Sequence, residues 1–252
     1  MPTHRQHAPP AAEAGWAYFL DVDGTLVDIA ATPEAIRVDA ALPGLLQQLH
    51  HASGGALALI SGRPLADLDR RLGGLRLTLA GQHGLERRDA AGRLWLHRTA
   101  PGAQQRLREG LAPLLKRHPG LLLEDKGLSL ALHYRQAPRL APQVHRVMAR
   151  LLAEAGHGLQ LQKGKHVVEI RPACADKGTA IAAYLGEPPF RDKCPVFIGD
   201  DFNDEHGFAV VNLAQGVSIK VGPGRTCARY RLSDVAAVHA WLSGVKTLAS
   251  GQ

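Results

Sequence analysis

Hydrophobic and polar positions follow one another along most of this chain in blocks that predict strands and helices in turn. Short apolar runs, typical of strands buried on both faces of a parallel sheet, occur at residues 18–20, 56–60, 77–80, 195–198 and 217–221. Helical spacing or capping predicts helices at residues 43–51, 65–72 and 177–185. Strands joined by helices predict an α/β fold whose core is a doubly wound, Rossmann-like parallel sheet.

The middle of the chain follows a different pattern. It holds two predicted amphipathic helices and two alternating, half-buried strands, at residues 104–118, 138–155, 128–134 and 167–170. This block is long enough for a small domain, and Pro-Gly and Arg-Pro pairs at 101–102 and 171–172 are typical of hinges. We therefore expect an inserted α+β cap domain.

The predicted parts of the chain are a disordered N-terminal tail at 1–15, a Rossmann-like core at 16–102 and 173–252, and the cap at 103–172. The tail is rich in His, Pro and Ala and lacks the apolar segment of a signal peptide. Three cysteines without paired or metal-ligand spacing favour a reducing compartment. No apolar run approaches membrane-spanning length, so we expect a cytoplasmic protein without a membrane partner.

The net charge of +7 comes entirely from the predicted cap. Residues 103–172 hold 12 Lys and Arg against 5 Asp and Glu, whereas the rest of the chain holds 18 against 18. There is no dense basic run, and aromatic residues make up only 5% of the chain. The distribution therefore favours a small anionic substrate over nucleic acid, with a merely solvated basic surface as the alternative.

Two carboxylates follow the first predicted strand directly. Asp21 and Asp23 belong to an Asp-Val-Asp-Gly segment, which favours a turn over a strand. Open parallel sheets bind their ligands where such strands end. One of the two carboxylates can attack a substrate, and the other can move a proton.

Further polar groups follow other strands of the predicted sheet. Ser61 follows the second strand, Asp200, Asp201 and Asp204 follow a later one, and Lys177 opens a helix. Two groups of carboxylates at one sheet edge would repel each other unless a cation joined them, and ligands that are all oxygen suit Mg²⁺. The lysine and the serine hydroxyl would hold phosphate oxygens.

These motifs resemble those of the haloacid-dehalogenase-like phosphatases and, more narrowly, of the trehalose-6-phosphate phosphatase family. The four core motifs are Asp-x-Asp-Gly-Thr at 21–25, Ser61, Lys177 and Gly-Asp-Asp-x-x-Asp at 199–204. The resemblance runs from about Trp16 to Trp241 and includes residues 60–63, 80–84, 163–172, 176–178 and 197–201. One departure is Asn203, where the family more often has Thr and other sugar phosphatases have Asn.

The resemblance implies roles for the core acids. Asp21 would attack phosphorus, form an aspartyl-phosphate and ligate Mg²⁺. Asp23 would protonate the leaving sugar oxygen, then deprotonate water, while its backbone carbonyl ligates the metal. Asp200 would be the third protein ligand, supported by Asp201 or Asp204.

The resemblance also implies which residues bind the substrate. The phosphate-binding residues would be Ser61, Gly62 and Lys177. The residues that bind the sugar would be Glu124, Lys126 and Glu169 in the cap, with Arg135 and Lys165 as further candidates. Hydrolysis of trehalose 6-phosphate, the last step of trehalose biosynthesis, is the implied activity.

Other functions stay open on the sequence alone. The same scaffold serves sucrose-phosphate and mannosyl-phosphoglycerate phosphatases, and a phosphomannomutase-like phosphotransferase has similar motifs. An acid at position 23 favours hydrolysis. A basic nucleic-acid-binding protein would show steeply salt-dependent binding, but the acid clusters argue against it. We expect a sugar-phosphate substrate, no nucleic acid and a monomer.

Overall fold

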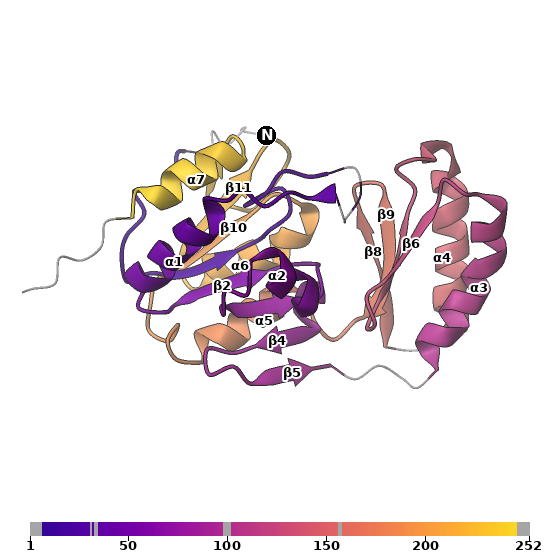
Figure 1. Ribbon diagram of the computed structural model, residues 1–252, viewed down its shortest axis with the longest axis horizontal. Coiled ribbons are helices and arrows are strands. Elements are labelled where there is room, and N and C mark those ends of the chain that lie inside the picture. Colours follow the sequence, from indigo (N-terminus) through magenta and orange to yellow (C-terminus); the bar gives the residue numbers. More distant parts are fainter. Residues whose placement is uncertain (1–6, 31, 33–34, 98–101, 156–157, 246–252) are drawn as a thin grey trace, which may run out of the picture. The chain divides into compact units, whose positions relative to one another are not determined.

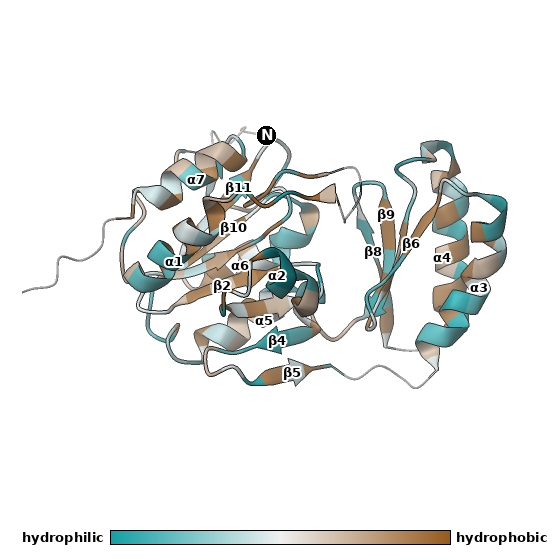
Figure 2. Ribbon diagram, in the orientation of Figure 1, coloured by the Kyte–Doolittle hydropathy of each residue, from teal (hydrophilic) through white to brown (hydrophobic). Residues whose placement is uncertain are grey.

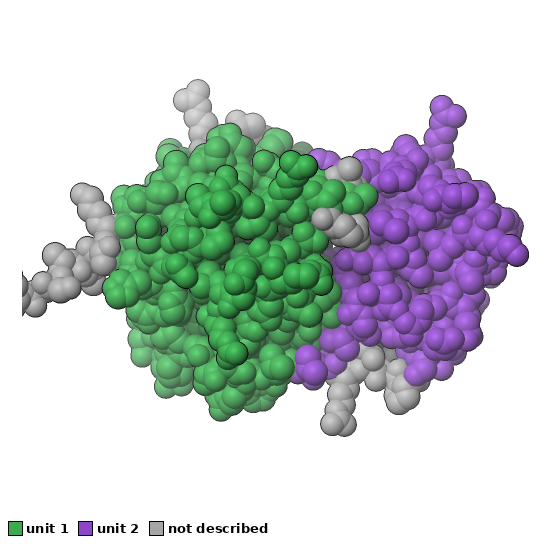
Figure 3. All heavy atoms as spheres, in the orientation of Figure 1, with its two compact units in different colours: residues 1–95, 176–252 green, residues 96–175 purple. Residues whose placement is uncertain are grey.

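The computed structural model describes residues 7–30, 32, 35–97, 102–155 and 158–245. The chain divides into two compact units, coloured separately in Figure 3. The core unit comprises residues 1–95 and 176–252, and the insert unit comprises residues 96–175. The insert unit is slightly longer than the predicted cap at both ends. Contacts within it hold the flanking segments: Ala173 donates its N–H to the Gly158 carbonyl at 2.9 Å, and Cys174 Sγ lies 3.5 Å from His97 Nδ1.

The core unit is built on an eight-stranded sheet in the order β12-β11-β10-β1-β2-β3-β4-β5 (Figure 1). Its strands are β1 (Ala17–Leu20), β2 (Leu57–Ile60), β3 (Thr78–Gly81), β4 (Glu86–Arg88), β5 (Leu94–Leu96), β10 (Pro195–Gly199), β11 (Val217–Val221) and β12 (Tyr230–Leu232). The pairs from β12 through β3 are parallel, and β4 is antiparallel to β3. The carboxyl ends of six parallel strands therefore share one edge.

Helices cover both faces of this sheet. They are α1 (Leu42–Ala52), α2 (Leu65–Arg71), α5 (Lys177–Leu185), α6 (Glu205–Leu213) and α7 (Val235–Ser243). Side chains alternate along β1, so that Tyr18 and Leu20 share a hydrophobic cluster with α1, α2 and α7, whereas Ala17 and Phe19 share one with α5 and α6. Figure 2 accordingly shows β2 and β10 as mostly hydrophobic, as two-sided burial requires.

The insert unit pairs an antiparallel sheet with two helices. Its elements are α3 (Ala103–Arg117), β6 (Leu122–Asp125), β7 (Leu130–His133), α4 (Ala141–Ala155), β8 (Leu159–Gly164) and β9 (Val167–Pro172), and the strand order is β6-β7-β9-β8. One face of the sheet shares a hydrophobic cluster with α3 and α4, to which Leu130, Leu132, Val168 and Ile170 contribute. Because side chains alternate along a strand, Glu124, His133 and Glu169 lie on the opposite face.

The predicted α/β class with a parallel sheet is confirmed. The predicted helix at 177–185 and strand at 217–221 match the structure to the residue. The predicted helix at 138–155 is shorter, because Pro138–Leu140 forms a 3-10 turn before α4 begins. No helix among the described residues has both the length and the apolar character needed to cross a membrane.

The N-terminal segment differs from its prediction over residues 7–15. Residues 1–6 of the predicted tail lie outside the described residues. Beyond them, the His7 carbonyl accepts a hydrogen bond from Arg231 N at 3.3 Å, and the Pro10 carbonyl accepts one from Trp241 Nε1 at 2.8 Å. These bonds hold residues 7–15 against the core unit, which a compositional argument alone does not reveal.

Candidate active site

The first acid pair stands where β1 ends. β1 lies between β10 and β2 in the sheet, and Asp21 continues the ladder by donating its N–H to the Ile198 carbonyl at 3.0 Å. The chain then turns tightly, because the Val22 carbonyl accepts hydrogen bonds from the N–H groups of Leu26 and Val27. Asp21 is buried, at 4% exposure, whereas the Asp23 side chain keeps 32% of its surface exposed. The turn thus presents one enclosed and one accessible carboxylate.

A second group of acids meets Asp21 at the end of β10. Carboxylate oxygens of Asp21, Asp200 and Asp204 all lie within 4.8 Å of one another. Gly24 makes this approach possible: it has a φ of +86°, and a Cβ at this position would lie 2.2 Å from Asp200 Oδ2. Parallel pairing of β1 with β10 therefore brings together acids that lie far apart in the sequence.

Lys177 joins these carboxylates. Its Nζ lies 2.7 Å from Asp21 Oδ1 and 2.6 Å from Asp204 Oδ1, and the residue is 3% exposed. It opens α5, whose start is fixed by Asp176, because the Asp176 carboxylate accepts a hydrogen bond from Thr179 N. The lysine therefore holds a defined position between acids from two strands.

Burial and mutual repulsion perturb the charges of this cluster. Burial, together with the charges of Asp204 and Asp200, raises the pKa of Asp21 well above its ordinary value, although Lys177 opposes the shift. Burial and the charge of Asp204 raise the pKa of Asp200 to about 6. Burial alone would lower the pKa of Lys177, but Asp204 and Asp21 raise it instead. Lys177 contacts two of the three carboxylates, and the charge of Lys220 opposes the shift of Asp200 without cancelling it, so the cluster favours additional positive charge.

Asp201 and Asp204 are neighbours in sequence but differ in environment. Asp204 is fully buried, and its Oδ2 accepts the N–H of Asp201 at 2.8 Å. The Asp201 carboxylate instead accepts the N–H of Phe202 at 2.7 Å and caps the short 3-10 turn Phe202–Asp204. Among the described residues, Asp204 thus belongs to the three-carboxylate group and Asp201 does not.

Ser61 and Gly62 follow β2, the neighbour of β1. Ser61 is fully buried, and its Oγ accepts the N–H of Arg63 at 3.1 Å. A Cβ on Gly62 would lie 2.7 Å from the His83 ring, so a larger residue here would require that ring to shift. The serine hydroxyl therefore stands at the same edge of the sheet as Asp21.

Two basic side chains enter the core site without having been singled out from the sequence. Arg63 pairs with Asp23 through a 2.7 Å contact between Nε and Oδ2. Lys220 is 5% exposed, and its Nζ donates to the Asp200 carbonyl and, at 2.9 Å, to the Val221 carbonyl. Arg63 lies within the matching segment 60–63, but the sequence analysis gave it no role.

Three of the predicted sugar-binding residues come together on the polar face of the insert sheet. Lys126 Nζ lies 3.3 Å from Glu169 Oε2, and both side chains are less than 10% exposed. Glu124 Oε2 lies 2.8 Å from His133 Nε2. Burial alone would raise the pKa of Glu124, but the hydrogen bond with His133 and the charge of Lys126 hold that pKa below its usual value. This face offers carboxylate acceptors and an ammonium donor side by side.

The other two candidates meet at the turn between β8 and β9. Arg135 follows β7, and its Nη2 donates to the Lys165 carbonyl, 3.4 Å away, in the turn between β8 and β9. This contact joins the two residues to each other, and no hydrogen bond described for the insert joins either one to Glu124 or Glu169. His133 shares the polar face and was not predicted, although the alternation of residues 128–134 places it there.

The oxygens of the three-carboxylate group suit a hard divalent cation. All three potential donors are carboxylates, which Mg²⁺ prefers over nitrogen or sulfur ligands. The raised pKa values of Asp21 and Asp200 indicate a site in which a cation would relieve repulsion. The residues present therefore fit a magnesium ion.

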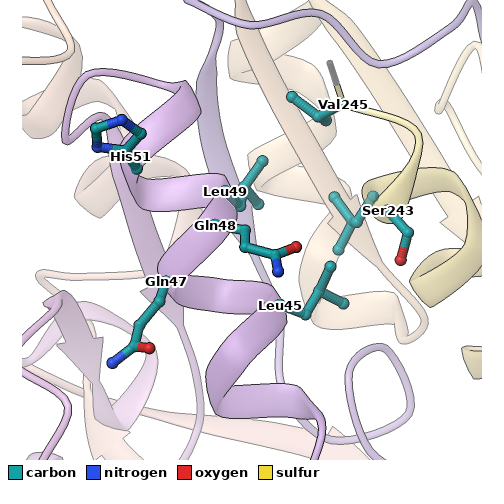
Figure 4. Close-up of a pocket in the computed structure, with 8 residues that line it drawn as sticks. Leu45, Gln47, Gln48, Leu49, His51, Ser243 and Val245 are labelled. Atoms are coloured by element: carbon teal, nitrogen blue, oxygen red, sulfur yellow. The ribbon is translucent and has the colours of Figure 1, made fainter. Parts of the chain in front are cut away.

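A separate pocket of about 350 Å³ lies between α1 and α7 (Figure 4). Its lining consists of Leu45, Gln47, Gln48, Leu49, His51, Leu242, Ser243 and Val245. None of the predicted site residues contributes to it, and the described residues that line it include no carboxylate or ammonium group. The reactive groups of the chain are at the strand ends instead.

Comparison with known proteins gives consistent results. The trehalose-phosphatase family matches residues 19–236. A trehalose-6-phosphate phosphatase of Escherichia coli is 44% identical over 239 residues, covering 94% of this chain and 89% of the relative. A probable trehalose-phosphate phosphatase of Sinorhizobium fredii is 46% identical over 209 residues, covering 82% and 78%. The C-terminal domain of a Candida albicans trehalose-6-phosphate phosphatase shares the fold, with a TM-score of 0.80, 24% identity and 91% coverage of both chains.

Proposed function

The chain belongs to the trehalose-phosphatase family, and we propose that it hydrolyses trehalose 6-phosphate to trehalose and phosphate, with Mg²⁺ and through an aspartyl-phosphate. The observation that carries this proposal is the meeting of Asp21 with Asp200, Asp204 and Lys177 where the parallel strands end. Asp21, the backbone carbonyl of Asp23 and Asp200 would hold the metal, and Asp204, whose carboxylate lies beside those of Asp21 and Asp200, would support the site. When bound, Mg²⁺ neutralises charge on the phosphoryl oxygens.

In the first half-reaction, a carboxylate oxygen of Asp21 attacks phosphorus. The bond between phosphorus and the sugar oxygen breaks, and its electron pair stays on that oxygen, which takes a proton from Asp23. Lys177 has three N–H donors, and Asp21 and Asp204 take two of them, which leaves one for a phosphate oxygen. Ser61 supplies a further hydroxyl donor at the adjacent strand end.

In the second half-reaction, water attacks the phosphorus of the aspartyl-phosphate. Asp23, now ionised, takes the proton from the water, and the bond between phosphorus and Asp21 breaks to restore the carboxylate. Asp23 thereby returns to its protonated form, and the sum of both steps consumes one water. The accessible position of Asp23 supports a role in both proton transfers, because each partner oxygen comes from outside the protein.

The polar face of the insert is our candidate for sugar recognition. Sugar hydroxyls both donate and accept hydrogen bonds, and Glu124, Lys126 and Glu169 offer both kinds of partner. The metal and the two half-reactions, the cytoplasmic location and the monomeric state stay predictions. So do the further sugar contacts of Arg135 and Lys165 and the phosphate contact of Gly62.

The test is phosphate release from a panel of sugar phosphates, with Mg²⁺ and with excess chelator. We expect trehalose 6-phosphate to be the preferred substrate and the chelator to abolish turnover. Mg²⁺ binding should also be measured directly by calorimetry, in wild type and in Asp200→Asn. Full activity in chelator with no metal bound would refute the metal site, and equal rates across the panel would refute the sugar assignment.

A further inference from the structure

Arg63 donates hydrogen bonds to both carboxylate oxygens of Asp23. It lies between β2 and α2, and its side chain is only 8% exposed. Its Nε donates to Asp23 Oδ2 at 2.7 Å and to Oδ1 at 3.1 Å, and its Nη2 donates to Oδ1 at 2.8 Å. A planar guanidinium that engages both oxygens fixes the plane of the carboxylate as well as its position.

The far side of the guanidinium is anchored as well. Nη1 donates to Asp67 Oδ2 at 2.8 Å, and Asp67 also accepts from Arg71 Nε at 2.8 Å and from Arg70. Burial alone would raise the pKa of Asp67, but hydrogen bonds from Arg71 and Arg63 hold that pKa below its usual value. The anchor therefore stays ionised at neutral pH.

The backbone of Arg63 is held too. Its N–H donates to Ser61 Oγ at 3.1 Å, and its carbonyl accepts the N–H of Gln82 at 2.9 Å. An arginine fixed at its backbone and at both ends of its guanidinium has little freedom left. A carboxylate bound to this guanidinium is therefore held in a fixed position and orientation.

Asp23 needs such support more than Asp21 does. Asp21 is enclosed, whereas a third of the Asp23 side chain is exposed and would otherwise move among several rotamers. Proton transfer requires the donor and acceptor atoms to lie within hydrogen-bond reach. A carboxylate has about four acceptor positions, and the hydrogen bonds from Arg63 do not occupy all of them. A position therefore remains on Asp23 for the proton that it transfers.

We propose that Arg63 is the positioning residue that orients Asp23 toward the leaving oxygen, with Asp67 as its anchor. This inference rests on the proposed role of Asp23 as the acid of the first half-reaction. The competing explanation is an ion pair that merely ties the turn after β1 to α2. The two explanations differ in whether the effect of losing Arg63 depends on the leaving group.

The experiment measures single-turnover release of the leaving group from two substrates. Trehalose 6-phosphate has a sugar alkoxide that needs a proton, whereas 4-nitrophenyl phosphate releases a stable anion that does not. Arg63→Ala should slow trehalose release by about 10²-fold, a loss typical of a misplaced catalytic group. Its nitrophenolate burst should change by less than about threefold, because that step gains little from a general acid.

Three further variants separate orientation from charge and from folding. Arg63→Lys keeps the charge without the planar fork and should stay at least about tenfold below wild type in trehalose release. Asp67→Asn should show the same substrate selectivity more weakly. Arg70→Ala is the matched control, because Arg70 also pairs with Asp67, is 73% exposed and makes no described contact with Asp23, so that both rates should stay at wild type.

The outcomes distinguish this inference from the function on which it rests. Asp23→Asn in the same assay should lose trehalose release selectively; an equal loss for both substrates would refute the acid role itself. If Asp23→Asn is selective but Arg63→Ala slows both substrates equally or neither, Arg63 is not a positioning residue. Wild-type rates in Arg63→Lys would show that charge alone matters and would overturn the orientation argument. Should Arg63→Ala fail to fold, the lysine and Asp67 variants decide the question.

Discussion

The core and insert units place their functional side chains in two different ways. In the core, the parallel strands are buried on both faces, and reactive groups stand at the strand ends, as Asp21 does after β1 and Ser61 after β2. In the insert, helices cover one face of an antiparallel sheet, and the polar groups occupy the other face, as Glu124 and Glu169 do. The difference follows from the sheets themselves, because only a sheet with one face free of packed helices can place polar side chains along its strands.

This contrast teaches where each unit tolerates change. An end-of-strand site depends on the register of several strands at once, and its acids are enclosed and coupled, as the contacts of Lys177 with Asp21 and Asp204 show. A face site depends only on the two-residue alternation of each strand, so single side chains can change with little effect on the fold. We therefore expect core substitutions to abolish chemistry and insert substitutions to change selectivity.

The largest expected effect is the loss of the nucleophile. Asp21→Asn removes the attacking carboxylate and should lower kcat for every substrate by at least about 10⁴-fold, because an amide oxygen is a poor nucleophile. Steady-state phosphate release is the measurement, with circular dichroism to check folding. Asp28→Asn, an exposed carboxylate beyond the same turn, is the matched control and should keep full activity. Residual turnover of Asp21→Asn near that of the control would exclude Asp21 as the nucleophile.

The second prediction tests whether the insert has a core of its own. Leu132 is fully buried among α3, α4 and the insert sheet, so Leu132→Ala should lower the stability of the insert by about 2–5 kcal/mol. Calorimetry should show that the unfolding transition of the insert moves to a lower temperature. Activity toward a small aryl phosphate should persist at temperatures below that transition. Leu122→Ala, at 42% exposure on the other face, should have little effect. A single transition lowered as a whole would mean that the two units unfold together.

How far the sequence predicts this molecule depends on how local the signal is. Asp21 directly follows a short apolar run, so the position of Asp21 at a strand end is a local property, and parallel pairing then brings Asp200 to it. Strands β4 and β5 were not predicted: Leu94–Leu96 forms the edge strand β5 and is exposed, and Glu86–Arg88 in its neighbour β4 is charged and only half-buried. Edge strands lack the two-sided burial that makes central strands recognisable.

The parts of the site that the sequence did not predict depend on contacts that form only in the folded chain. Nothing local tells which of Asp201 and Asp204 turns inward; the 3-10 turn decides this by using Asp201 as its cap. Likewise, Arg63 could pair with any nearby acid, and only the fold brings Asp23 and Asp67 to opposite ends of its guanidinium. His133 was predictable in principle as a residue of the polar face, because strand alternation places it there; pairing of β7 with β6 then brings it to Glu124.

The third prediction tests the face site. Glu169→Ala removes an acceptor from the polar face. The loss of transition-state binding for trehalose 6-phosphate should be about 1–3 kcal/mol, measured as a fall in kcat/KM. A small aryl phosphate, which has no sugar hydroxyls, should lose almost nothing. Glu154→Ala is the matched control, because Glu154 lies on α4 at 59% exposure, paired with Arg150. Equal losses for both substrates would make Glu169 a general structural residue and would remove the distinction between chemistry and recognition.

The smallest expected effect concerns pH and separates the enclosed acids of the core from ordinary carboxylates. The pKa of Asp200 is raised from its ordinary 3.8 to about 6, first by burial and then by Asp204, so the folded state binds this proton more readily than the unfolded state does. The stability that Asp200 contributes is thus fully present below about pH 4 and is lost as the pH rises through about 6. In chelator, wild type should lose a few degrees of Tm over this window relative to Asp200→Asn, which cannot ionise there. Added Mg²⁺ should restore that loss at the high end of the window, because the cation favours the ionised acids. Parallel Tm profiles for the two proteins in chelator would show that Asp200 ionises in the folded state as it does in water, as an ordinary exposed carboxylate would.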